Sequence, residues 1–88
     1  MELVDTIELM RSENFIDRFK AEYYQTKIRH DKLHVMTVKL EAGTLDFTPA
    51  CGLDIFKNQL WQMEQYLYSL ELRAEIEGID LTMTTAEE

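Results

Sequence analysis

Side chains of which most are apolar and several polar recur at alternating four- and three-residue steps between residues 16 and 40, the spacing of a helix that packs along one face. Asn14 precedes this seam as a helix N-cap, and Gly43 follows it as a residue that readily takes the left-handed conformation at a helix end. Because no Pro or Gly interrupts the stretch, we expect one helix over residues 14–43, roughly 40 Å long. The seam consists of Ile16, Phe19, Tyr23, Thr26, His30, Leu33, Thr37 and Leu40.

A second seam with the same spacing runs through the other half of the chain and ends before Gly78. Its members are Leu53, Phe56, Leu60, Met63, Leu67, Leu70 and Ala74. Residues 43–52 lie between the two seams and hold two of the three glycines and the only proline, which is typical of a connecting loop. The two stretches therefore predict a long antiparallel helical hairpin.

The two ends of the chain carry weaker patterns. Leu3, Ile7 and Met10 stand at helical spacing, which predicts a short N-terminal helical arm. The last ten residues are acidic and rich in Thr, and we expect them to be extended or disordered. The predicted fold class is all-α, in a single domain over residues 1–88. Its expected parts are an arm (residues 1–13), a hairpin (residues 14–78, with its loop at 43–52) and a tail (residues 79–88).

Several apolar residues of the hairpin fall outside both seams. They are Tyr24, Ile28, Val35, Val38, Trp61, Tyr68, Leu72 and Ile76. A two-helix hairpin buries too little surface to be stable alone, so these residues indicate that hairpins associate into helix bundles. Closed symmetry makes a homodimer or a homotetramer the expected assembly.

The composition narrows the protein's class. The hydrophobic fraction is 45%, as in folded proteins, but no apolar run reaches the roughly 20 residues that a transmembrane helix needs. The N-terminus lacks the pattern of a signal peptide, and the single Cys51 cannot form an internal disulfide. We therefore expect a cytoplasmic protein without a membrane partner.

Charge is distributed unevenly along the chain. The net charge of −8 argues against binding of long nucleic acid, yet seven of the nine Lys and Arg residues lie between residues 11 and 39. Folding the predicted hairpin about its loop pairs residues whose numbers sum to roughly 95. One flank then matches Lys20, Lys27 and His34 with Glu64, Glu71 and Glu75.

The other flank, which we call the basic flank, is positive, with only Glu22 expected nearby to balance it. Its residues are Arg18, Arg29, Lys32 and Lys39 on the first helix and Gln59, Gln62, Tyr66 and Arg73 on the second. A solvated basic face that keeps the protein soluble is the simplest interpretation. The alternative is an anion site, since guanidinium groups bind phosphates bidentately and aromatic rings stack on bases. In that site Arg18, Arg29, Lys32 and Arg73 would hold phosphates, and Tyr66 with Gln62 would contact bases or ribose.

Catalytic and metal-binding patterns are weak. His30 and His34 stand four residues apart, as in the zinc-binding H-E-x-x-H motif, but Asp31 replaces the glutamate and no third ligand follows at a familiar spacing. We expect a hydrogen-bonded His30 in the core, His34 on a flank, and no metal. Cys51 has no evident His partner and is expected to be a small buried residue. No phosphate loop or catalytic triad is present, so we expect a non-enzymatic protein without a cofactor.

Three stretches of the chain resemble small helical proteins of bacteriophages, including crAss-like and Bacillus-type phages. They are KIRHDKLH at residues 27–34, EAGTLDF at residues 41–47 and QYLYSLELRAE at residues 65–75. Within that group the chain resembles the anti-CBASS sponges, which are tetrameric phage proteins. The resemblance extends over roughly residues 14–81 and excludes the N-terminal arm.

The resemblance implies a phage immune-evasion protein in the host cytoplasm that sequesters cyclic dinucleotide defence signals without cleaving them. Two other functions stay open. The acidic surface, with Glu64, Glu71 and Glu75, would suit a protein inhibitor that mimics nucleic acid and blocks a host enzyme. A structural or accessory phage protein with no ligand is the third.

Overall fold

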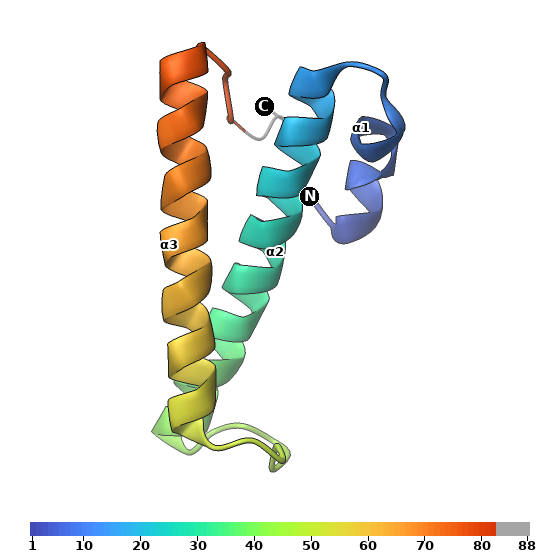
Figure 1. Ribbon diagram of the computed structural model, residues 1–88. Helices are drawn as coiled ribbons and strands as arrows, with labels where there is room; N and C mark the ends of the chain where they lie inside the picture. The colour runs from blue at the N-terminus through green and yellow to red at the C-terminus, as the bar shows by residue number, and fades with distance from the viewer. Residues whose placement is uncertain (83–88) are drawn as a thin grey trace.

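The computed structural model describes residues 1–82, and within them the chain is all-α, as expected. A short 3₁₀ helix, η1 (Leu3–Thr6), leads directly into α1 (Ile7–Arg11), and the two form the N-terminal arm. Two long helices follow, α2 (Phe15–Ala42) and α3 (Leu53–Glu77), which lie antiparallel as a hairpin (Figure 1). The arm packs beside α2 on the side away from α3, so α2 is the central element (Figure 1).

The ends of α2 follow the capping residues in the sequence. The backbone N–H of Ile16 donates to Asn14 Oδ1 at 2.8 Å, which satisfies one of the free amides at the start of the helix. Gly43 has φ of 80° and its N–H donates to the carbonyl of Leu40, so the helix ends there. Both capping predictions are confirmed. The helix has 28 residues, which at 1.5 Å per residue accounts for the 43 Å length of the molecule.

Two hydrogen-bonded pairs fix the register of the hairpin. Tyr23 contacts Glu71, and His30 contacts Glu64. In both pairs the residue numbers sum to 94, which agrees with the value of roughly 95 expected from folding the hairpin about its loop.

The main core lies at the arm end of the hairpin. Its buried members are Phe19, Tyr23, Tyr24, Leu67, Leu70, Ala74 and Ile79, with Met1, Leu9 and Leu81 packed around them. The arm and the segment after α3 therefore complete a core that the two long helices could not close alone.

One prediction about this region is wrong. Tyr24 and Ile28, expected to be free for association, are buried within the chain. The tail is expected to be extended or disordered. Residues 79–82 are extended, but Ile79 is buried and the Tyr24 hydroxyl donates to the carbonyl of Thr82 at 3.2 Å. The remaining tail residues lie outside the described part of the chain.

The loop end of the hairpin is only two helices thick (Figure 1). Thr37 and Leu60 are buried there, whereas Val35 and Val38 on α2 are exposed. Cys51 is also exposed, contrary to the expected burial, because the loop extends beyond the ends of both helices. None of the described helices is long and apolar enough to cross a membrane.

Candidate functional site

The basic flank is less open than the sequence indicates, because the N-terminal arm supplies partners for part of it. The Arg18 guanidinium donates to the carbonyl of Ser12 at 2.8 Å, which ties the start of α2 to the turn before it. Lys32 Nζ lies 3.2 Å from Glu2 Oε1. Lys32 therefore lies on the arm side of α2, and the expectation that only Glu22 would balance the flank is wrong.

Arg73 is held by two contacts of its own. Its guanidinium carbon lies 4.8 Å from the centre of the Phe19 ring, within range of a cation–π interaction, and its Nε lies 3.5 Å from a carboxylate oxygen of Glu77. The aromatic face fixes the side chain across the seam between α2 and α3. The side chain is half-exposed, so part of it is open to solvent.

Arg29, Tyr66 and Gln62 form the open part of the flank. All three are exposed, and within residues 1–82 Arg29 makes no ion pair. The register of the hairpin sets Arg29 level with Tyr66, and Gln62 lies one turn away from Tyr66 on the same helix face. The arrangement presents a free guanidinium beside an aromatic ring and an amide.

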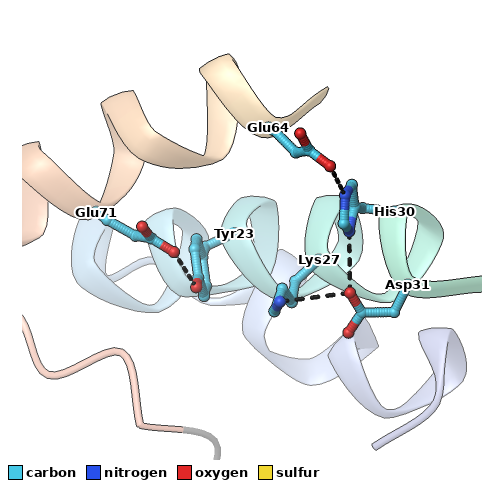
Figure 2. Close-up of polar contacts among 6 residues, drawn as sticks. All are labelled: Tyr23, Lys27, His30, Asp31, Glu64 and Glu71. Atoms are coloured by element: carbon cyan, nitrogen blue, oxygen red, sulfur yellow. Dashed lines mark hydrogen bonds and ion pairs between the residues drawn. The ribbon is translucent and has the colours of Figure 1, made fainter. Parts of the chain in front are cut away.

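The opposite flank carries a row of polar contacts that joins α2 to α3 (Figure 2). The Tyr23 hydroxyl donates to Glu71 at 2.6 Å. His30 lies between two carboxylates, with Nε2 at 2.7 Å from Glu64 and Nδ1 at 3.0 Å from Asp31. These side chains connect the helices and leave Glu64 and Glu71 engaged, so this flank is structural.

The contacts in that row shift the protonation of its members. Burial lowers the pKa of His30, but the hydrogen bonds to Glu64 and Asp31 outweigh it, so the pKa is raised. For Asp31, burial raises the pKa, and the contacts with His30 and Lys27 outweigh that effect and lower it. Burial, and next the hydrogen bond to Glu71, raise the pKa of Tyr23 well above its usual range. The His30 imidazole is thus held in its charged form at neutral pH more readily than a free histidine.

The sequence prediction of a hydrogen-bonded His30 is confirmed, although its partners were not foreseen. His34 is exposed and its ring stacks on His30 with centres 6.0 Å apart. Among the described residues no group of three His, Cys, Asp or Glu side chains could hold a metal ion. The i, i+34 pairing of His30 with Glu64 could have been found from the expected hairpin register, because both residues fall at the edge of the seam.

The family model for Sequestin matches residues 13–76 of the chain. The chain belongs to the Sequestin family. The Sequestin match covers all of α2 and all but the last residue of α3, and leaves the arm outside. All six candidate site residues, Arg18, Arg29, Lys32, Gln62, Tyr66 and Arg73, lie inside it. No curated protein and no solved structure matches the chain.

Proposed function

We propose that the protein binds a cyclic dinucleotide on its basic flank and sequesters it without cleaving it. Membership of the Sequestin family is compatible with a protein that retains a ligand. The family match also covers the two helices that carry the flank. Sequestration is thus supported at the level of the family, and the ligand class is supported by the side chains.

The open guanidinium of Arg29 is the observation on which the ligand class depends. A guanidinium binds a phosphate through two parallel hydrogen bonds. The Arg29 guanidinium is exposed and makes no ion pair within residues 1–82, so it can form such bonds. Tyr66 offers a ring for stacking on a base, and Gln62 offers an amide for a base edge or a ribose hydroxyl. Arg18 and Arg73 add positive charge on the same flank. Lys32, already paired with Glu2, is the weakest of the six candidates.

The residue types on the flank favour binding over hydrolysis. None of the six candidates is a carboxylate, a histidine or a thiol, the groups that most often act as general bases near neutral pH. A bound phosphodiester would be held and not cleaved. Following the resemblance to anti-CBASS sponges, we propose that the ligand is a bacterial defence signal and that the protein acts for a phage in the host cytoplasm.

Native mass spectrometry of the full chain with a panel of cyclic di- and trinucleotides tests this function. We expect the protein to gain the mass of an intact nucleotide. Arg29→Ala should weaken binding at least about tenfold, because it removes a charge-assisted contact of roughly 1.5–3 kcal/mol. Arg11→Ala is the matched control, since Arg11 is an exposed arginine on the arm. Unchanged affinity in Arg29→Ala with an intact oligomer would contradict the assignment.

An oligomer that binds none of the nucleotides would favour the acidic-inhibitor alternative. Glu64 and Glu71 are poor choices for testing it, because they hold the hairpin together through His30 and Tyr23. Glu75 makes no ion pair within residues 1–82, so Glu75→Gln tests the alternative without breaking the row of contacts between the helices.

A further inference from the structure

The face of α3 that points away from α2 carries an uncovered apolar stripe. Its large members are far from buried: Trp61 is 59% exposed, Tyr68 62%, Leu72 49% and Ile76 77%. With Gln65 between the first two, they follow one another at steps of three or four residues, which is the spacing of a helix packing seam. We call Trp61, Gln65, Tyr68, Leu72 and Ile76 the outer stripe.

No part of residues 1–82 covers the outer stripe. The buried residues of α3, Leu60, Leu67, Leu70 and Ala74, lie on the opposite face and pack toward α2. The arm lies on the far side of α2, as Figure 1 shows. The stripe is therefore a second seam on a helix whose first seam is already used.

The exposed apolar area of the stripe is more than half of the area that a specific interface buries on each partner. Side chains of this size have about 150–250 Å² each, so the exposed fractions of the four apolar residues amount to about 500 Å². A specific interface buries about 800 Å² on each partner. The polar residues beside the stripe, such as Asn58 and Ser69, would supply the remainder.

We propose that the outer stripe is covered by the outer stripe of a second copy of this chain, with the two α3 helices antiparallel. The pattern is self-complementary about a point between Tyr68 and Ser69. Trp61 then lies opposite the partner's Ile76, and Gln65 lies opposite the partner's Leu72. A two-fold axis at that point makes the same surface serve both copies, as a closed dimer requires.

The charges on α3 favour the antiparallel arrangement. The end of the helix holds Glu71, Glu75 and Glu77 against a single Arg73, and no basic residue occupies its last turn. A parallel pair would set these acidic ends side by side in a dimer whose subunits each carry a net charge of −8. The antiparallel pair places the two copies of Glu77 about 17 residues apart, or roughly 25 Å along the helices, and the two copies of Glu75 about 13 residues apart.

The same arrangement gives the basic flank a contribution from the partner, a point that rests on the proposed function. An antiparallel two-fold brings like flanks together, so Arg73 of one copy lies opposite the partner's Gln62 and the partner's Tyr66. The ligand site would then extend across the axis, with one nucleotide bound per two chains.

Sedimentation equilibrium of the full chain without ligand tests the interface. We expect a dimer, or a tetramer built from it, and we expect Leu72→Asp to reduce a dimer to a monomer or a tetramer to dimers. Tyr68→Glu should do the same, and circular dichroism checks that both variants stay helical. Ile55→Asp is the matched control, because Ile55 is 54% exposed on α3 and lies outside the stripe. A monomeric wild-type protein at about 100 µM, or unchanged masses in both stripe variants, would overturn the proposal.

Disulfide trapping tests the orientation in a Cys51→Ser background. Ser69→Cys lies beside the proposed axis and should crosslink rapidly to itself. Gln65→Cys should not, since two copies of residue 65 would be separated by about seven residues, or roughly 10 Å along the helices. The reverse result would indicate a parallel pair and overturn the antiparallel arrangement.

These measurements separate the interface from the ligand. The mass and crosslinking experiments contain no nucleotide, so their failure leaves the binding test on Arg29 intact. A dimer that binds no nucleotide would contradict the proposed function and support the interface.

Discussion

At the scale of single residues, His30 joins the two long helices through its contacts with two carboxylates. It donates from both ring nitrogens only when protonated, and its raised pKa follows from Glu64 on α3 and Asp31 on α2. The residue is therefore a pH-dependent link between the helices. Its position on the seam was readable from the sequence, whereas the strength of the link depends on distances that only the folded hairpin sets.

Replacing His30 with Gln should reduce the pH dependence of stability. A pKa raised in the folded state stabilises the fold below the unfolded value of about 6.5, and this contribution disappears as pH rises through the folded value. We expect His30→Gln to lower the free energy of unfolding at pH 5.5 by only about 1 kcal/mol, because the partner carboxylates are half-exposed and solvent weakens their contacts. The cost should be much smaller at pH 9, where the charged imidazole no longer contributes. Urea unfolding at both pH values measures the difference. His34→Gln, which leaves both contacts in place, serves as the control, and an equal cost for His30→Gln at the two pH values would contradict the role of the imidazole.

At the scale of elements, the two long helices were predictable from the sequence, and the segments that cover the second face of α2 were not. The periodic seams and the capping residues Asn14, Gly43 and Gly78 specify where α2 and α3 lie, because these signals are local. Tyr24 and Ile28 showed that a second face of α2 is apolar, but a periodic pattern does not say which segment covers a face. The arm and residues 79–82 cover it, through contacts between residues far apart in the sequence.

The segment after α3 should contribute measurably to stability through Ile79. Its side chain is buried against the core, so Ile79→Ala should lower the free energy of unfolding by about 2 kcal/mol. Ile55→Ala, at an exposed position of α3, should cost less than about 0.5 kcal/mol. Chemical denaturation at low protein concentration compares the two, and a cost for Ile79→Ala no larger than for Ile55→Ala would show that the segment does not stabilise the fold.

At the scale of the whole molecule, the hairpin is thick at one end and thin at the other. The core cluster, the arm and the C-terminal segment all lie toward the start of α2, whereas the loop end has little beyond Thr37 and Leu60 buried. Stability should therefore vary along the helices. The six candidate site residues could be chosen from charge and register, but the partner of Lys32 could not, because Glu2 belongs to an arm whose docking the sequence does not specify.

Hydrogen exchange should follow this gradient. Amides of residues 36–42 and 54–60 should exchange at least about tenfold faster than those of residues 20–28 and 67–74, since the loop end can open without disrupting the core. Mass spectrometry of proteolytic fragments resolves these regions. Uniform protection along both helices would mean that the loop end is covered in the assembly, by a partner placed differently from the one proposed.

The exposed thiol of Cys51 at the hairpin tip has a practical consequence for any study of assembly. In an antiparallel dimer the two tips point in opposite directions, so oxidation would join one dimer to the next end to end. Chains of increasing mass would form in air, and they would imitate a larger oligomer. Masses measured in a reducing buffer, or on Cys51→Ser, are therefore the ones that report the assembly encoded by the helices.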